Sequence, residues 1–124
     1  MIRNGRFADG MESVIGTKRF NFAVRIVNLY KYLTQQKKEY ILSKQLLRSG
    51  TSIGANVAEA KQAQSKPDFV SKMNIALKET AETKYWINLL CATNFLTKEK
   101  SSSVLTDCIE LEKILVRIIK SSRQ

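Results

Sequence analysis

The chain has 124 residues, of which 44% are hydrophobic and 26% are charged, so it holds enough apolar material for one core. One proline and five glycines are too few turn residues for a β-sandwich or barrel, and they favour an all-helical domain. The sequence has no histidine, which excludes the commonest general base and the Ser-His and Cys-His nucleophile arrangements. The formal net charge of +10 makes a polyanion or an acidic protein surface the first partner to consider.

Residues 1–16 hold three of the five glycines, balanced charge and no helical periodicity. We expect them to form a flexible leader before a single domain at residues 17–124. Met11 offers a second start for translation, so the first ten residues are expected to lie outside the fold.

The sequence predicts a protein of the cytoplasm. No apolar run approaches the roughly 18 residues of a membrane span, and the N-terminus lacks the apolar segment of a signal peptide. Cys91 and Cys108 lie in apolar helical stretches and are too few for a zinc site. We therefore expect two buried, reduced thiols, as in cytosolic proteins.

Two helices are predicted in the first half of the chain. In residues 18–36, apolar residues recur every three or four positions, as in a helix with one buried stripe: Phe22, Ala23, Ile26, Leu29, Tyr30 and Leu33. After a polar break, residues 39–64 form the second helix, with core positions at Leu42, Leu46, Ile53, Val57 and Ala60. Gly50 and Gly54 weaken this helix by roughly 1 kcal/mol each relative to alanine. They indicate close approach by another helix, or a kink.

Two more helices are predicted in the second half. Residues 65–68 mark a helix start, because Ser65 or Lys66 can cap the helix, Pro67 suits its first turn and Asp68 favours its positive end. The third helix covers residues 67–92, with one face formed by Phe69, Met73, Ala76, Thr80, Thr83 and Ile87. The fourth covers residues 98–121, with core positions at Val104, Cys108, Leu111, Leu115 and Ile118. Short connections predict an all-α, antiparallel up-down-up-down four-helix bundle.

A row of polar residues, which we call the polar ladder, follows one edge of the second helix. Its members, Arg48, Ser52, Asn56 and Glu59, are separated by four, four and three positions. Such a row can fix helix register or subunit pairing through satisfied hydrogen bonds. The alternatives are a ligand or catalytic site and simple solvent exposure. One carboxylate without a histidine or a second nearby acid is a poor acid–base set, so we expect no enzyme activity, metal or cofactor.

This segment resembles the 23S ribosomal RNA intervening-sequence protein family. The resemblance lies in Arg48, Ser52-Ile53, Asn56-Val57-Ala58-Glu59 and the helix start at Asp68-Phe69, and the pattern of helices covers about residues 15–120. Ala60 stands where the family usually has glycine. The resemblance implies an up-down bundle of bacterial origin that assembles into a ring-like homopentamer without enzyme activity. The family is also similar to the accessory variability determinant protein of diversity-generating retroelements, which binds nucleic acid and a reverse transcriptase.

Positive charge is concentrated in residues 17–64, which carry nine Lys and Arg against two Glu. The candidate nucleic-acid-binding residues are Lys18, Arg19, Arg25, Lys31, Lys37, Lys38, Lys44, Arg48 and Lys61. Tyr32 and Tyr40 lie among them and could stack on bases. The alternative is a solvated surface that keeps the protein soluble. No motif for sequence-specific readout is present, so we expect electrostatic binding that is indifferent to nucleotide sequence.

The third helix is predicted to be apolar on two faces. Opposite its core stripe it carries Ile75, Tyr85, Trp86 and Leu89, residues of the kind that anchor subunit interfaces. The alternative is that the leader or the loop after Ala92 covers them. We therefore predict a non-enzymatic, homo-oligomeric scaffold that binds nucleic acid or a nucleic-acid-handling protein, and no membrane or small-molecule substrate. A protein-interaction module whose basic charge is incidental is the alternative.

Overall fold

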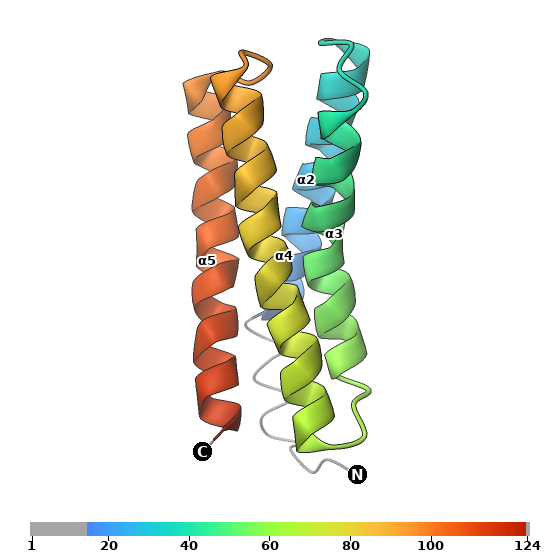
Figure 1. Ribbon diagram of the computed structural model, residues 1–124, viewed down its shortest axis with the longest axis vertical. Helices are drawn as coiled ribbons and strands as arrows, with labels where there is room; N and C mark the ends of the chain where they lie inside the picture. The colour runs from blue at the N-terminus through green and yellow to red at the C-terminus, as the bar shows by residue number, and fades with distance from the viewer. Residues whose placement is uncertain (1–14, 124) are drawn as a thin grey trace.

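The computed structural model describes residues 15–123, which form four α-helices and no strand. The helices are α2 (Thr17–Gln35), α3 (Leu42–Ala60), α4 (Lys66–Ala92) and α5 (Lys98–Ser122). The all-helical prediction is confirmed. In Figure 1, α2 and α4 rise while α3 and α5 descend, so the α2–α3 and α4–α5 turns lie at the same end. Residues 1–14, which hold most of the expected leader, lie outside the described residues.

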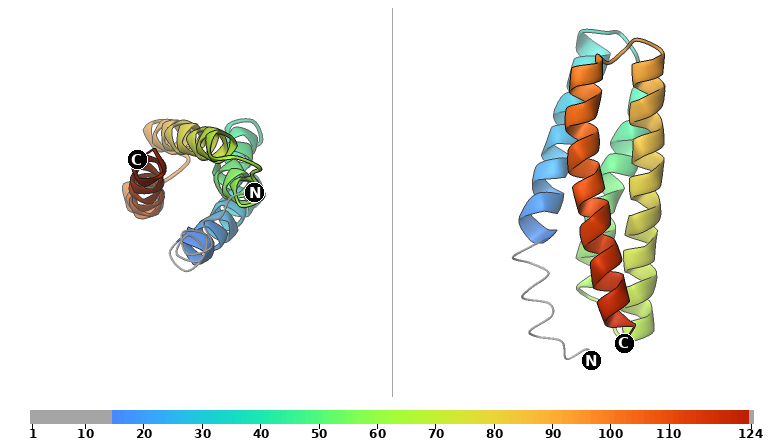
Figure 2. Two further views of the ribbon diagram at one scale, coloured as in Figure 1. Left: turned by 90° about the horizontal axis from the view of Figure 1, so that it is seen from below. Right: turned by 90° about the vertical axis from the view of Figure 1, so that its left-hand side faces the viewer.

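The helices form a curved row with α2 and α5 at its two ends (Figure 2). Extensive contacts join α3 to both α2 and α4, and α4 to α5, whereas α2 and α5 contact each other much less. Two ion pairs bridge α2 and α5: Lys18 Nζ lies 3.0 Å from Glu110 Oε2, and Arg25 Nη1 lies 2.6 Å from Asp107 Oδ2. Partly exposed pairs of this kind contribute about 0–1 kcal/mol. Packing against the inner helices therefore holds α2 and α5 in place.

Apolar side chains from all four helices meet in one core. Its largest fully buried members on the helices are Ile26, Leu33, Leu46, Ile53, Met73, Ile87, Leu90, Leu111 and Leu115. Ile15, the first described residue, is buried with them, so packing begins before the expected start of the domain at Thr17. None of the four described helices is long and apolar enough to cross a membrane.

Helix α3 begins at Leu42, three residues later than predicted. Lys38 takes a left-handed backbone conformation with φ of 56°, which ends the preceding turn. The Glu39 carboxylate then accepts hydrogen bonds from the backbone N–H groups of Ile41, Leu42 and Ser43, at 3.1, 2.9 and 2.7 Å. Burial alone would raise the pKa of Glu39, but these three bonds outweigh it and lower the pKa. Glu39 therefore caps α3 as an ionised side chain.

The other helix ends follow local capping chemistry. Helix α3 ends at Ala60, four residues earlier than predicted, and the N–H of Lys61 still bonds to the Val57 carbonyl oxygen at 3.2 Å. Helix α4 starts at Lys66, one residue earlier than predicted, and the Asp68 N–H donates to Ser65 Oγ at 3.1 Å. Ser65 is thus the N-cap, and Asp68 lies in the first turn near the positive helix end.

Glycine allows a close approach between α2 and α3 at Gly50. A Cβ atom on Gly50 would lie 2.8 and 2.9 Å from the two γ-carbons of Ile26, far inside van der Waals contact. The expected close approach of another helix is confirmed at this position. Gly54 differs, because a Cβ there would lie 3.6 Å from the nearest atoms of Arg19, which is an ordinary contact.

We expect Gly50→Ala to lower the free energy of unfolding by about 1–2 kcal/mol, because overpacking against Ile26 outweighs the gain in helix propensity. Gly54→Ala is the matched control and should raise it by roughly 0.5–1 kcal/mol, since its new methyl group meets only ordinary contacts. Urea denaturation of both variants measures the two changes. A Gly50→Ala variant as stable as Gly54→Ala would contradict the close approach.

Candidate functional site

Both ends of the polar ladder form ion pairs from α3 to α4. Arg48 Nη2 lies 2.6 Å from Glu82 Oε2, and Glu59 Oε1 lies 3.2 Å from Lys72 Nζ. The two pairs are separated by about three turns of α3, or roughly 16 Å. Contacts this far apart disfavour sliding of α3 along α4, which agrees with a structural role for the ladder.

The two middle members of the ladder bond to the backbone of their own helix. Ser52 Oγ donates to the Arg48 carbonyl oxygen at 2.6 Å, and Asn56 Nδ2 donates to the Ser52 carbonyl oxygen at 2.8 Å. Both side chains are half-buried. The Asn56 side-chain hydrogen bond thus stays within α3, and the ion pairs to α4 come from the ends of the ladder.

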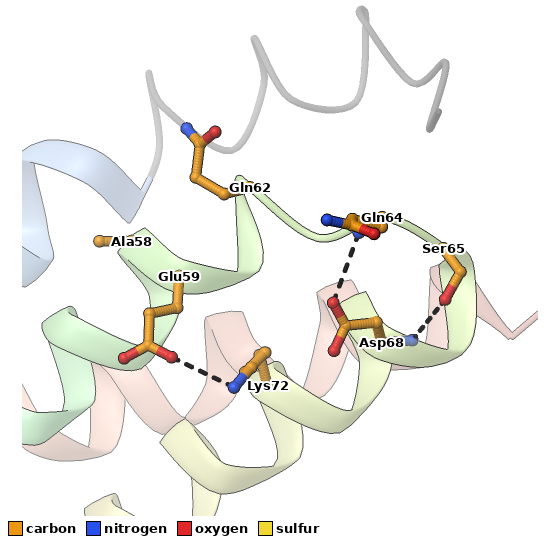
Figure 3. A pocket seen from close by; sticks show the side chains of 7 residues that line it. All are labelled: Ala58, Glu59, Gln62, Gln64, Ser65, Asp68 and Lys72. Atoms are coloured by element: carbon orange, nitrogen blue, oxygen red, sulfur yellow. Dashed lines mark hydrogen bonds and ion pairs between the residues drawn. The ribbon is translucent and has the colours of Figure 1, made fainter.

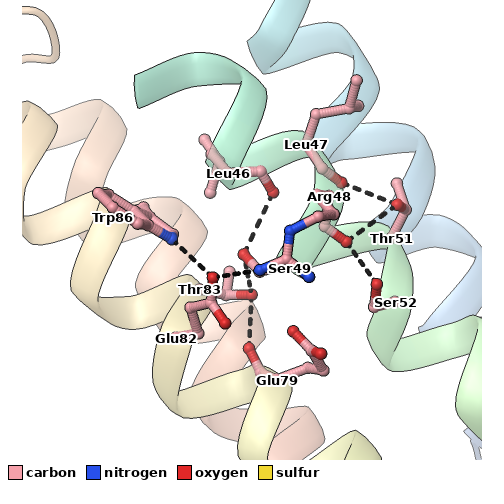
Figure 4. A network of polar contacts seen from close by, with 10 residues as sticks. All are labelled: Leu46, Leu47, Arg48, Ser49, Thr51, Ser52, Glu79, Glu82, Thr83 and Trp86. Atoms are coloured by element: carbon pink, nitrogen blue, oxygen red, sulfur yellow. Dashed lines mark hydrogen bonds and ion pairs between the residues drawn. The ribbon is translucent and has the colours of Figure 1, made fainter. Parts of the chain in front are cut away.

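A second set of polar groups joins α3 and α4 beside Arg48 (Figure 4). The Glu82 carboxylate accepts from Arg48 and also from Trp86 Nε1, which lies 3.1 Å from Oε2. Next to it, the fully buried hydroxyl oxygens of Ser49 on α3 and Thr83 on α4 lie 3.0 Å apart. Small side chains at both positions let the two helices meet through a hydrogen bond instead of through apolar packing alone.

Glu79 is the acid of this group that lacks a full set of partners. Its Oε1 atom is buried and has no hydrogen-bond partner among the described residues (Figure 4). Burial raises the pKa of Glu79, the neighbouring Glu82 carboxylate raises it further, and Arg48 partly offsets both effects. The folded protein therefore favours the neutral form of Glu79 more than the unfolded chain does.

We expect Glu79→Gln to raise the melting temperature near neutral pH, because the neutral amide removes a poorly solvated charge. A carboxyl group whose pKa is raised by folding lowers stability as the pH climbs above its ordinary value of 4.5. The melting temperatures of variant and wild type should therefore converge below about pH 4 and separate toward pH 7. Circular dichroism melts across this range measure the difference, and a difference independent of pH would contradict the raised pKa.

A polar pocket of about 640 Å³ lies beside the turn between α3 and α4 (Figure 3). Its lining residues are Ala58, Glu59, Gln62, Gln64, Ser65, Asp68 and Lys72. Glu59 pairs with Lys72, and Asp68 Oδ2 accepts the Gln64 N–H at 3.4 Å. The polar groups of the pocket thus bond to one another and hold the turn. Within residues 15–123, no group of three Cys, Asp or Glu side chains is placed to hold a metal ion.

The structure separates the nine candidate nucleic-acid-binding residues. Lys18, Arg25 and Arg48 form ion pairs with carboxylates of α5 or α4. Half-buried Arg19 donates to the Gly54 carbonyl oxygen at 3.4 Å. The remaining five are exposed, namely Lys31, Lys37, Lys38, Lys44 and Lys61. Four of the nine side chains therefore contact other groups of the bundle, and five face solvent.

The α2–α3 and α4–α5 turns lie at the same end of the bundle (Figure 1), and exposed lysines lie in or next to both turns. We call this surface the basic end, and its lysines are Lys37, Lys38, Lys44, Lys98 and Lys100. None of these five lysines has an ion-pair partner in the described part of the chain. Two uncharged side chains, Tyr40 and Ile41, lie among them and are 57% and 75% exposed.

The sequence did not group Lys98 and Lys100 with the other lysines of the basic end. Lys100 Nζ lies 4.7 Å from the centre of the Tyr32 ring, so the start of α5 contacts the end of α2. The net charge of residues 95–124 did not point to these two lysines, because four acids offset six bases in that segment. Two lysines beside a predicted turn were the available signal.

The apolar residues predicted for a subunit interface are unequally exposed. Tyr85 is 59% exposed and Ile75 is 38% exposed, whereas Trp86 and Leu89 are half-buried. Trp86 packs against the core, and its ring meets that of Tyr85 edge-on, with centroids 5.0 Å apart. Tyr85 is therefore the clearest candidate contact of this set, and Trp86 also supports its own subunit.

Both cysteines are unbridged thiols, in line with the predicted reduced state. The predicted burial is confirmed for Cys108, but it is wrong for Cys91, which is only half-buried near the end of α4. Burial raises the pKa of Cys108 to about 12, Glu112 adds to the shift and Lys84 opposes it. The Cys108 thiol is therefore a core side chain without nucleophilic character at neutral pH.

The chain matches a known protein family and a solved structure. The 23S rRNA-intervening sequence protein family matches residues 12–117. The chain belongs to this family. A protein with unknown function from the S23 ribosomal protein family of Bacteroides thetaiotaomicron has a crystal structure that superposes with a TM-score of 0.85 at 56% identity. That match covers 86% of this chain and 99% of the other. No curated protein matches the chain.

Proposed function

We propose that the protein is a non-enzymatic, oligomeric scaffold with an antiparallel up-down-up-down bundle, whose basic end binds nucleic acid without sequence specificity. The basic end supports this proposal, because five exposed lysines gather there without carboxylate partners in the described chain. The alternative partner of the scaffold is a protein that handles nucleic acid. The proposed location is the cytoplasm, where two unbridged thiols remain reduced.

The chemistry of the basic end suits a phosphate backbone. Each lysine that meets a phosphate releases condensed counterions, which favours binding at low salt. Exposed Tyr40 offers a ring on which an unpaired base can stack. Glu39 forms no ion pair with these lysines, because its carboxylate accepts three backbone N–H groups, and Glu99 is an exposed acid beside Lys98. The two acids reduce the net charge of the basic end without pairing with any of its lysines.

Assembly would multiply this weak local attraction. Five copies of a chain with a net charge of +10 carry about +50, and each copy presents one basic end. A strand that reaches two or more basic ends binds with avidity, since the second contact is intramolecular. A homopentamer that uses the Tyr85 face of α4 is therefore part of the proposal.

We expect the triple substitution Lys37→Glu, Lys38→Glu and Lys44→Glu to weaken binding of duplex and single-stranded oligonucleotides by at least about tenfold. The slope of log affinity against log salt should become shallower by roughly 2–3, because up to three phosphate contacts are lost. Fluorescence anisotropy between about 50 and 200 mM salt measures both quantities.

The matched control makes the same change in net charge elsewhere, through Lys113→Glu, Arg117→Glu and Lys120→Glu on α5. This variant should keep most of the affinity. Equal losses in the two variants would contradict a role for the basic end. If the wild type binds no oligonucleotide at about 50 mM salt, the nucleic-acid proposal fails and a protein-interaction module becomes the better interpretation.

We expect Tyr85→Glu to dissociate the oligomer at micromolar concentration, because it places a charge in the proposed interface while leaving the core intact. Phe20→Glu is the matched control, since Phe20 is an aromatic side chain on α2 with 68% exposure. Light scattering should give a pentamer for wild type and control. A wild-type mass near 14.1 kDa would contradict assembly, and dissociation by Phe20→Glu alone would place the interface on α2.

A further inference from the structure

A groove between α4 and α5 combines apolar and basic side chains away from the basic end. It borders the Tyr85 face of α4, because Lys78 and Ala81 precede Tyr85 by seven and four positions. It has a volume of about 640 Å³. Leu77 and Ala81 of α4 and Val116 of α5 form its apolar part. The basic lining residues are Lys78, Lys113, Arg117 and Lys120. We call it the α4–α5 groove.

The positive charge of the α4–α5 groove is not neutralised by its surroundings. Its four basic side chains are exposed, and none has an ion-pair partner among residues 15–123. The acid in the lining, Glu112, is bound by Lys84, whose Nζ lies 2.9 Å from both carboxylate oxygens. The groove therefore presents four free cations to whatever binds in it.

The acids of α5 that face α2 are already paired. Asp107 and Glu110 pair with Arg25 and Lys18 of α2, although Glu110 lies in the same row of the helix as the bases that follow it. Lys113, Arg117 and Lys120 all line the groove and are spaced by four and three positions, so a positive charge recurs at each turn of α5. The acids and bases of α5 nearly cancel when they are counted along the sequence. In the folded structure, the bases that line the α4–α5 groove make this surface strongly positive.

We propose that the α4–α5 groove binds an acidic amphipathic helix of a partner protein. A helix lying along α5 presents side chains at the same spacing of three and four positions, so its carboxylates can pair with Lys113, Arg117 and Lys120. Its apolar face would cover Leu77, Ala81 and Val116, as in other helix-in-groove complexes. This inference does not depend on nucleic-acid binding at the basic end.

Two other occupants fit the groove less well. A phosphate backbone would satisfy the cations but would gain nothing from the apolar part of the groove. A second copy of this chain offers few free acids, because five of the nine carboxylates in residues 15–123 are in ion pairs: Glu59, Glu82, Asp107, Glu110 and Glu112. Charge complementarity therefore favours a different, acidic protein.

The test uses a fluorescent helical peptide of about 18 residues, with Leu at positions i, i+4, i+7 and i+11 and Glu at the flanking positions. A peptide of identical composition, shuffled so that Leu and Glu do not segregate, is the control. Anisotropy with the full-length protein at about 50 mM salt should show at least tenfold tighter binding of the patterned peptide.

Variants of the protein locate the binding site. Lys113→Glu with Arg117→Glu should weaken binding of the patterned peptide at least tenfold, through lost attraction and new repulsion. Ala81→Gln fills the apolar part of the groove from an exposed helix position without changing charge, and should weaken binding severalfold. Lys37→Glu with Lys38→Glu changes net charge equally at the basic end and should alter affinity less than twofold.

Three results would overturn the proposal. The first is the absence of binding by the patterned peptide, and the second is equal binding by the shuffled peptide. The third is displacement of the peptide by a 20-nucleotide single strand together with no effect of Ala81→Gln, which would identify a general polyanion site. If the wild-type protein binds the patterned peptide but no oligonucleotide at about 50 mM salt, the proposed function is refuted and this inference still stands.

Discussion

Helix α3 packs against both α2 and α4, and two consecutive small residues let both neighbours approach it. Gly50 leaves room for the branched side chain of Ile26, and the Ser49 hydroxyl meets that of Thr83 on α4. Because α2 contacts α5 only weakly, the position of α2 depends on its contact with α3. The ion pairs at the two ends of the polar ladder then hold α3 against sliding along α4. Helix α5 then completes the bundle by packing against α4.

The distribution of acids determines where the protein can attract anions. Most described carboxylates lie between helices, in ion pairs that join α2 to α5, α3 to α4 or α4 to α5. Exposed pairs add little stability individually, yet each one neutralises a cation that would otherwise face solvent. Most of the exposed lysines and arginines without a carboxylate partner in residues 15–123 lie at the basic end and in the α4–α5 groove. Two separate positive surfaces, one with an exposed aromatic ring and one with an apolar lining, can serve two different partners.

The helices were predictable because each core stripe has strong 3.6-residue periodicity. The ends of α3 were less predictable. In the sequence, Glu39 continues the helical pattern. In the structure, the backbone of Lys38 is left-handed, and the Glu39 carboxylate caps the first N–H groups of α3. Glutamate is not among the usual N-cap residues, so composition gives no signal for this role. The cap of α4 was predictable, because Ser65, Pro67 and Asp68 each have a well-known local preference.

The sequence by itself determined the helix count, the buried faces, the family and the excess of positive charge. These properties depend on residues close together in the chain, where periodicity and composition act directly. Tertiary structure alone decided which cations remain free, because ion pairs such as Arg25–Asp107 and Arg48–Glu82 join residues far apart in sequence. The tertiary structure also places Lys98 and Lys100 at the same end of the bundle as the lysines of the α2–α3 turn. It places the last bases of α5 in the groove that Leu77 lines. Charge acts through space over roughly 10 Å, so its pattern follows the packing of the helices rather than their order along the chain.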